Sequence, residues 1–525
     1  MNINTVVIQA GGRGSRMGWL TDHKPKCLVP VDNKPMLFHL MDHFPNARFV
    51  VVADYRADVL ERYLRAFCRA PWTLVRAQGQ GSLAGIGQAL ELLNGNEPFA
   101  LVWSDLVPAH DTQIEALPEG NWIGLVPGMD CRYRYHQGRV EPVSSDTDGV
   151  AGFFVFAGKD QLPQTPPEGE FADYLGNLCP EFRPLSLSGW REVGTLQAWN
   201  RLASDTGRSR GFNRVTVVDD LVCKEPIDDQ GRKLARLEVN WYRTVLALGY
   251  GRIPEIHSLE PLCMERIGGK HPFELDGDQP GGPSREAVLD EIFETLGTLH
   301  ELSSGPADRE SLWLTYGQKT LDRVGMVLDL VPGGRLSRLV VNGKRCAGMS
   351  VWEEEIRQRA TARLPAAFCL IHGDPTFSNI LIRETSGKAV LIDPRGYFGR
   401  QEELGDPAYD YAKLYYSLSG HYDQINRNRF TLSYETEPAE EHDRAPAFRV
   451  TVRTEQNGWE GMEEAFFDRL PPGHDRETIL FLQGVIWLSV TSYFQEHYDA
   501  VCAAYYLGCY HMQLWKEACD ARSSE

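Results

Sequence analysis

The sequence has no CxxC pair, no long apolar run and fewer basic than acidic residues. Its 525 residues include 54 lysines and arginines against 72 aspartates and glutamates, which gives a formal net charge of −18. A surface with this charge repels phosphate backbones and anionic lipid headgroups. We therefore expect no nucleic-acid partner and no membrane partner, although a few local cations are enough to bind a nucleotide.

The eleven cysteines are scattered through the chain and odd in number. This pattern fits neither a disulfide framework nor a zinc site, and it favours a reducing compartment. The amino terminus has no basic segment followed by an apolar one, and the most apolar late stretch, residues 479–490, is short and interrupted by Gln483 and Gly484. We expect a cytoplasmic protein and leave its oligomeric state open.

Alternating strand and helix patterns fill the first hundred or so residues. At about 150 residues per domain, the length predicts two to four domains. The predicted strands are residues 6–10, 49–53, 72–76 and 99–104, and the predicted helices between them are residues 58–68 and 83–93. This rhythm predicts a mostly parallel α/β sheet, which binds ligands at the carboxyl ends of its strands.

A different pattern begins near residue 206. Two short strands, 215–218 and 221–224, flank a tight turn, and a helix over 232–248 follows them. We expect a further β segment at 262–266, a largely helical remainder, and loops at 270–286 and 435–446. The economical interpretation is two domains, residues 1–205 and 206–525.

A glycine-rich turn follows the first predicted strand. Glycines at a strand end let backbone N–H groups approach a triphosphate, and nearby cations can neutralise the charge that develops as pyrophosphate leaves. The candidate glycines are Gly11, Gly12 and Gly14, and the candidate cations are Arg16 and Lys26. A glycine turn alone is weak evidence, because a plain strand-to-helix turn has the same composition.

The combination GGRGSRM and KPKCLVPV resembles the nucleotidyltransferases that make nucleotide sugars and CDP-choline. The resemblance covers about residues 3 to 203 and implies a GT-A-like, Rossmann-related fold. It implies that Arg16 and Lys26 are catalytic, that Asp105 and Glu192 hold Mg²⁺, and that Gln78 and Gly81 join the three glycines in binding the nucleotide. The segment 78–85 departs from the family's usual base-binding stretch, so CTP, UTP and GTP all stay open.

A second motif follows the predicted strand 368–371. Phosphoryl transfer to an alcohol needs a carboxylate that orients and deprotonates the hydroxyl, and oxygen ligands that hold Mg²⁺ on the phosphates. The spacing HxDx4N, with an aspartate after the next strand, matches a kinase catalytic loop. Asp374 suits the first role, and Asn379 and Asp393 suit the second.

Upstream of this loop, Lys224 lies on a predicted strand and Glu238 lies on the apolar face of the following helix. A carboxylate on a buried face needs a cationic partner, so we predict a Lys224–Glu238 pair that positions the nucleotide phosphates. A surface lysine beside an edge glutamate is the simpler alternative.

These residues together resemble the aminoglycoside phosphotransferase and choline kinase family over about residues 206 to 510. The resemblance implies a two-lobed, protein-kinase-like fold, an adenine-binding hinge at Met264 and Glu265, and structural roles for Asp406 and Asp410. Residues 209–213 are a short substitute for a glycine-rich loop. His372 is expected to brace the catalytic loop.

The two resemblances predict a bifunctional enzyme. It would phosphorylate a small hydroxyl compound with ATP, and then transfer NMP from a second NTP to that phosphate, using Mg²⁺ in both steps. A sugar or sugar derivative for a surface glycan is the first expectation. The alternatives are a choline, ethanolamine or polyol kinase joined to a cytidylyltransferase, and a single-activity enzyme whose other domain only binds nucleotide. A protein kinase is a remote alternative, because no APE-type segment is present.

Overall fold

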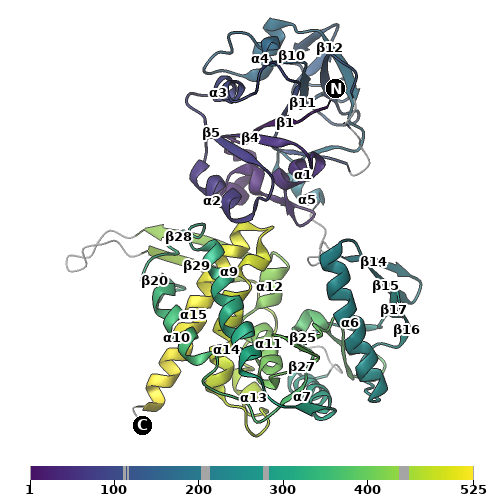
Figure 1. Ribbon diagram of the computed structural model, residues 1–525, viewed down its shortest axis with the longest axis vertical. Helices are drawn as coiled ribbons and strands as arrows, with labels where there is room; N and C mark the ends of the chain where they lie inside the picture. Colours follow the sequence, from purple (N-terminus) through teal and green to yellow (C-terminus); the bar gives the residue numbers. More distant parts are fainter. Residues whose placement is uncertain are drawn as a thin grey trace, which may run out of the picture. The chain divides into compact units, whose positions relative to one another are not determined.

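The computed structural model describes residues 2–109, 114, 117–202, 213–275, 283–436 and 448–523. The chain divides into two compact units (Figure 1). The first comprises Met1–Asp205 with Gln495–Tyr498, and the second comprises Thr206–Phe494 with Asp499–Glu525. The expected linker at 204–210 and residues 209–212 of the substitute loop at 209–213 lie outside the described residues.

The first unit is built on a seven-stranded sheet of order β12-β8-β11-β6-β1-β4-β5 (Figure 1). Four of its six neighbouring pairs are parallel, and the two pairs that β11 makes are antiparallel. The prediction of a mostly parallel α/β sheet is therefore confirmed. The strands are β1 (Thr5–Gln9), β4 (Arg48–Ala53), β5 (Trp72–Arg76), β6 (Phe99–Trp103), β8 (Asn121–Leu125), β11 (Val150–Phe156) and β12 (Phe182–Ser186).

Helices pack against this sheet because its central strands are apolar on both faces, as parallel strands usually are. Val7, Val50 and Leu101 on one face, and Ile8, Val51 and Val102 on the other, are at most 1% exposed. The helices are α1 (Met36–His43), α2 (Ala57–Phe67), α3 (Ile86–Glu91), α4 (Phe171–Leu178) and α5 (Leu196–Leu202). Short ribbons complete the unit: β2 (Pro30–Val31) with β3 (Lys34–Pro35), β7 (Leu106–Val107) with β13 (Arg191–Glu192), and β9 (Arg134–His136) with β10 (Arg139–Glu141).

The second unit begins with a four-stranded antiparallel sheet of order β14-β15-β17-β16, with helix α6 beside it (Figure 1). The elements are β14 (Asn213–Val218), β15 (Leu221–Pro226), α6 (Asp229–Ala247), β16 (Ile256–Leu259) and β17 (Leu262–Glu265). The Asp228 side chain accepts a hydrogen bond from the Gly231 N–H and so caps α6. The hairpin, the helix and the third strand lie where the sequence pattern placed them.

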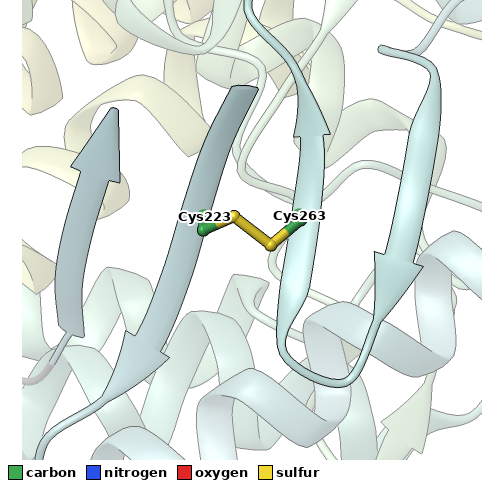
Figure 2. Close-up of a disulfide and its surroundings, with 2 residues drawn as sticks. All are labelled: Cys223 and Cys263. Atoms are coloured by element: carbon green, nitrogen blue, oxygen red, sulfur yellow. A yellow bond between two sulfur atoms is a disulfide. The ribbon is translucent and has the colours of Figure 1, made fainter. Parts of the chain in front are cut away.

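One cysteine pair corrects the expectation that no disulfide forms. Cys223 on β15 and Cys263 on β17 are bonded across the two neighbouring strands, and Figure 2 shows their side chains directed at each other. The register of the two strands places these residues opposite one another. Forty residues separate them in the sequence, so their spacing carried no sign of the pairing.

The larger part of the second unit is mainly helical. The buried helix α11 packs against α14, which also packs against α9. The helices are α7 (Arg285–Glu301), α8 (Arg309–Leu312), α9 (Lys319–Val327), α10 (Met349–Arg359), α11 (Pro407–Leu418), α12 (Tyr422–Asn426), α13 (Glu463–Phe467), α14 (Arg476–Ser489) and α15 (Tyr498–Ser523).

Several strands lie where a largely helical remainder was expected. A four-stranded sheet of order β21-β20-β29-β28 contains β20 (Arg338–Val341), β21 (Lys344–Ala347), β28 (Phe430–Thr436) and β29 (Phe448–Thr454). The last two residues of β28 are the first two of the segment expected as a loop at 435–446, and the rest of that segment lies outside the described residues. Residues 276–282 of the other expected loop, 270–286, also lie outside them. Smaller sheets carry β18 (Gly269–Lys270), β23 (Ile380–Arg383) and β24 (Ala389–Leu391), and β19 (Ser304–Gly305), β22 (Phe368–Leu370) and β27 (Leu404–Gly405). A final pair is β25 (Tyr397–Phe398) with β26 (Gln401–Glu402).

One helical stretch in the described residues, Arg476–Phe494, is long and apolar enough to cross a membrane by length and composition. This stretch is longer than the apolar segment 479–490 expected from the sequence. The helix begins at Arg476, and a 3₁₀ turn, Thr491–Phe494, follows it. Within it, 72% of the most apolar window is buried inside the protein. Core helices of soluble proteins pass the same test.

The buried imidazole of His511 on α15 predicts that acid destabilises the second unit. Burial lowers the pKa of His511 from 6.5 to about 3, and its Nδ1 has no hydrogen-bond partner among the described residues. Below pH 6.5 the unfolded chain binds a proton that the folded chain does not bind. The free energy of unfolding therefore falls by about 1.4 kcal/mol per pH unit as the pH drops from 6.5 toward 3.

We expect His511→Phe to flatten this pH dependence. Hydrogen exchange of peptides from α14 and α15 in a urea series, read at several pH values, measures the slope. His257→Gln is the matched control, because this histidine is exposed on β16. An unchanged slope in His511→Phe would contradict the assignment.

Candidate functional site

A cavity of about 420 Å³ lies in the first unit at the carboxyl ends of β1 and β6. Parallel sheets bind ligands at this edge. Most of the residues that the sequence suggested for a nucleotide site in this unit line the cavity. These are Gly11, Gly12, Gly14, Arg16, Lys26, Gly81 and Asp105.

Two glycines of this cavity are required by its geometry. Gly14 has φ +68° and begins the 3₁₀ turn Ser15–Thr21, and a Cβ there would lie 2.9 Å from Lys26 Cβ. Gly81 has φ +87°, and a Cβ there would lie 2.4 Å from the Gly169 carbonyl oxygen. Larger residues at either position would displace the cavity wall.

Lys26 and Asp105 form a direct ion pair at the centre of the cavity, with side chains only 11% and 14% exposed. Glu192 on β13 lies close to this ion pair, and the surroundings of Gly194 show it. A Cβ added at Gly194 would be 2.7 Å from Glu192 Oε1, 3.2 Å from Lys26 Nζ and 3.4 Å from Arg16 Nη2, so these three side chains end around the same glycine. Burial and the Asp105 charge raise the pKa of Glu192. Two carboxylates and two cations therefore converge on one point.

The residues present fit a divalent cation that substrate phosphates help to hold. Asp105 Oδ1 is buried without a hydrogen-bond partner in the described part of the chain. No group of three or more His, Cys, Asp or Glu side chains gathers as a metal site among the described residues. Mg²⁺ commonly uses only one or two carboxylates with substrate phosphates, and Asp105 with Glu192 would supply these ligands.

Gln78 is exposed and is not among the residues that line the cavity, so its nucleotide-binding role stays a prediction. Among the polar residues that do line the cavity, the sequence analysis missed Gln9, Asp54, Arg132, Tyr133 and Glu170. Gln9 donates through Nε2 to the Ser82 carbonyl, and its Oε1 has no partner within the described residues. Its position at the end of β1, directly before the glycines, was the available signal.

In the second unit, the turn after β22 brings Asp374 and Asn379 together. The Asn379 amide nitrogen donates to the Asp374 carbonyl at 2.8 Å and to Asp374 Oδ2 at 3.3 Å. Lys413 on α11 lies 2.9 Å from Asp374 Oδ1, a contact that the sequence reading missed. Asp374 is therefore held between an amide and an ammonium group.

The predicted pair of Lys224 and Glu238 is present, with 2.6 Å between Nζ and Oε1. Lys224 also contacts Asp393, which follows β24 with a left-handed φ of +56°. Burial disfavours the charged ammonium, but Asp393 and Glu238 outweigh burial and raise the pKa of Lys224 above its ordinary value. A cavity of about 320 Å³ opens beside this pair, among β15, β17 and α6.

Asp410 on α11 braces the turn that carries Asp374. Its carboxylate accepts hydrogen bonds from the backbone N–H groups of His372 at 2.8 Å and Gly373 at 2.7 Å, and it lies 3.0 Å from His300 Nε2. Burial lowers the pKa of His372, whose Nε2 lies 2.9 Å from the Ile392 carbonyl and whose Nδ1 accepts from the Asp374 N–H. These contacts match the bracing roles expected for His372 and Asp410.

The expected hinge lies on and after β17. Met264 is 4% exposed, and Glu265 binds Arg383 of β23 through both carboxylate oxygens. The hydrogen bonds from Arg383 lower the pKa of Glu265. The Glu265 side chain therefore joins the small sheet to β23, and its predicted contact with nucleotide stays a prediction.

Asn379 and Asp393 would also suit Mg²⁺. Asn379 uses its amide nitrogen for Asp374, which leaves its oxygen as a ligand, and Asp393 adds a carboxylate. One amide oxygen, one carboxylate and substrate phosphates form a usual Mg²⁺ set.

Two protein families match the chain. Residues 6–127 match the MobA-like NTP transferase domain, and residues 213–448 match the phosphotransferase enzyme family, also called APH. The chain thus carries a nucleotidyltransferase domain at its amino end and an APH phosphotransferase domain at its carboxyl end. Both are enzyme families, as the motifs predicted.

Three similar proteins illustrate the first match. N-acetylmuramate alpha-1-phosphate uridylyltransferase of Caulobacter vibrioides is 29% identical over 222 residues, which are 38% of this chain and 84% of that protein. UTP–glucose-1-phosphate uridylyltransferase AglF of Haloferax volcanii is 34% identical over 15% of this chain and 34% of its own length. The inositol-1-phosphate CTP transferase structure from T. maritima, at 14% identity, covers 38% of this chain and 92% of its own, with a TM-score of 0.31.

The ion pair in the second unit predicts the effect of Glu238→Gln. The variant keeps the side-chain shape but removes the negative charge that holds Lys224 in place. We expect ATP affinity to fall about 10- to 100-fold, as for loss of a charge-assisted hydrogen bond. Binding of a fluorescent ATP analogue measures this. Glu225 lies on the same hairpin as Lys224 and is exposed, so the control variant Glu225→Gln should bind ATP like wild type. Equal ATP affinity in wild type, Glu238→Gln and Glu225→Gln would refute the role of the pair.

Proposed function

We propose that the chain is a bifunctional enzyme that phosphorylates a sugar or sugar derivative with ATP and then activates the phosphate with a second NTP. The observation that carries the proposal is that each unit holds its own reactive set. Lys26, Asp105 and Glu192 converge in the first unit, and Asp374 and Asn379 lie beside the Lys224 network in the second. We place the functional boundary near residue 205, where the two units divide.

In the first step, the acceptor hydroxyl oxygen attacks the γ-phosphorus of ATP and the bond to the ADP oxygen breaks. Asp374 orients the hydroxyl and takes its proton, while Lys224, held by Glu238, positions the ATP phosphates. The balance is one phosphomonoester and one ADP for each ATP. Mg²⁺ bound at Asn379 and Asp393 would neutralise charge on the phosphates.

In the second step, a phosphate oxygen of that phosphomonoester attacks the α-phosphorus of an NTP, and pyrophosphate leaves. Arg16 and Lys26 neutralise the departing charge, the glycine turn receives the phosphates, and Asp105 with Glu192 would hold Mg²⁺. The names of the two uridylyltransferase relatives support UTP as the first nucleotide to test. GTP and CTP are tested after it. The product would be an NDP-linked precursor for a surface glycan, made in the cytoplasm, where ATP and NTPs are present.

Crossed variants test whether the two activities are separate. Asp374→Asn should lower ADP release about 10²- to 10⁴-fold, because it removes the base, yet it should keep pyrophosphate release from a supplied sugar 1-phosphate and UTP. Asp105→Asn should show the reverse. A mass-spectrometric screen of free sugars, amino alcohols and polyols with ATP identifies the acceptor, and coupled assays of ADP and pyrophosphate give the rates.

Two exposed aspartates serve as controls, Asp160→Asn in the first unit and Asp468→Asn in the second, and both should retain both rates. Full ADP release by Asp374→Asn would remove this residue from the mechanism. Loss of both activities in Asp105→Asn would give Asp105 a folding role. If only one activity exists in wild type, the other unit binds nucleotide without turning it over.

A further inference from the structure

Three basic side chains, those of Lys319, Arg395 and Lys413, lie near Asp374 in the second unit, and the Arg323 side chain lies near Lys319 and Arg395. Lys319 and Arg323 come from α9, Arg395 follows β24, and Lys413 belongs to α11. We call these four residues the basic cluster. All four are half-buried, and the charges of Arg395, Arg323 and Lys413 all act on Lys319. Lys319, Arg323 and Lys413 lie outside the sequence motifs, and Arg395 follows Asp393 closely but was assigned no role.

Tyrosine rings and backbone carbonyls, not carboxylates, hold most of this cluster. Arg395 donates to the hydroxyl groups of Tyr409 at 3.0 Å and Tyr397 at 2.8 Å. The Lys319 ammonium lies 5.7 Å from the centre of the Tyr409 ring. Arg323 donates to the Ser489 carbonyl at 2.8 Å.

The cluster therefore carries a large excess of positive charge. In the described part of the chain, the one carboxylate within ion-pair distance of any of its members is Asp374, which pairs with Lys413. Burial and the neighbouring cations lower the pKa of Lys319 well below its ordinary value. Like charges held together in poorly hydrated surroundings are costly unless an anion joins them. This excess is local, because the chain as a whole has a net charge of −18.

The cluster is separate from the residues proposed to bind ATP. Lys224 already faces two carboxylates, Glu238 and Asp393. Asp374 has Asn379 near one carboxylate oxygen and Lys413 near the other. Asp374 thus lies between the proposed metal ligands and the basic cluster, so the cluster borders the acceptor side of the reacting hydroxyl.

We infer that Lys319, Arg323 and Arg395 bind a carboxylate on the acceptor, so the substrate of the kinase unit is a hydroxylated acid such as a sugar acid. This inference rests on the proposed kinase function. A guanidinium binds a carboxylate through two parallel hydrogen bonds, and an ammonium adds a point charge. Lys413 has a different role, as a positioning residue for Asp374.

Pairs of related acceptors with and without a carboxylate test the inference. N-acetylmuramate is compared with N-acetylglucosamine, and galacturonate with galactose, by ADP release from the full chain. We expect at least one acid to have a kcat/KM about 10- to 100-fold above its neutral partner. Lys319→Met with Arg323→Gln should remove this preference by raising the KM for the acid at least tenfold, and the KM values for the neutral sugar and for ATP should change much less.

Matched variants separate charge from packing. Lys319→Arg should retain much of the preference because it keeps the charge, and Arg357→Gln should behave like wild type, because Arg357 is an exposed cation on α10 paired with Glu353. Equal use of acids and neutral sugars would overturn the inference. A raised KM for ATP in the double variant would assign the cluster to the nucleotide, and equal loss with both acceptors would make its role structural.

Two further measurements keep the outcomes distinct. Galactose 6-phosphate is included as an acceptor, and a preference for it over galacturonate would overturn the assignment to a carboxylate. If wild type releases no ADP with any acceptor, the kinase proposal fails. Calorimetric titration with N-acetylmuramate and galacturonate then still tests whether the basic cluster binds a carboxylate. The inference requires that wild type binds at least one of these acids and that the double variant binds it at least tenfold more weakly.

Discussion

Lysine ammonium groups held against carboxylates, with little access to water, are the constraint on which both candidate sites depend. Lys26 meets Asp105 in the first unit, and Lys224 meets Glu238 and Asp393 in the second. Such pairs gain little net stability, because desolvation offsets their attraction, but loss of one partner leaves a buried charge that is costly. Their value here is positional. The pairs Lys26–Asp105 and Lys224–Asp393 join elements far apart in the sequence, and Glu238 holds Lys224 from the next helix, at the places where we propose that phosphates bind.

Asp410 performs the same task for the backbone. By accepting two N–H groups of the catalytic turn, it ties helix α11 to Asp374, and α11 also supplies Lys413 on the other side of the same carboxylate. One buried helix thus sets both the path of the turn and the orientation of its reactive group. Small movements of α11 would change both together, because packed interiors transmit strain.

Local patterns were enough to predict four of the seven strands of the first sheet (β1, β4, β5 and β6), the hairpin of β14 and β15, helix α6 and the Lys224–Glu238 pair. Buried apolar runs indicated the four strands, a tight turn indicated the hairpin, and the apolar face of the following helix indicated the position of Glu238. The glycine turn and the HxDx4N loop could be located because their chemistry requires consecutive residues. Gly14, for example, adopts the left-handed conformation that the turn demands.

Features that depend on long-range register could not be predicted in this way. Cys223 and Cys263 meet only because β15 pairs with β17, and β20 pairs with β29 across more than a hundred residues. The basic cluster is a further example, since α9, the segment after β24 and α11 carry no shared motif. Its charge excess becomes visible only when the fold brings those side chains to Asp374.

The bond between Cys223 and Cys263 gives the small lobe a second covalent topology. When it is formed, the chain between the two residues is a closed ring that contains the whole of α6, and with it Glu238. A peptide bond cut inside that ring would leave the two fragments joined, whereas the same cut in the reduced protein would release them. The connectivity of the lobe thus depends on the thiol–disulfide balance of its surroundings, although its sequence and strand order stay the same.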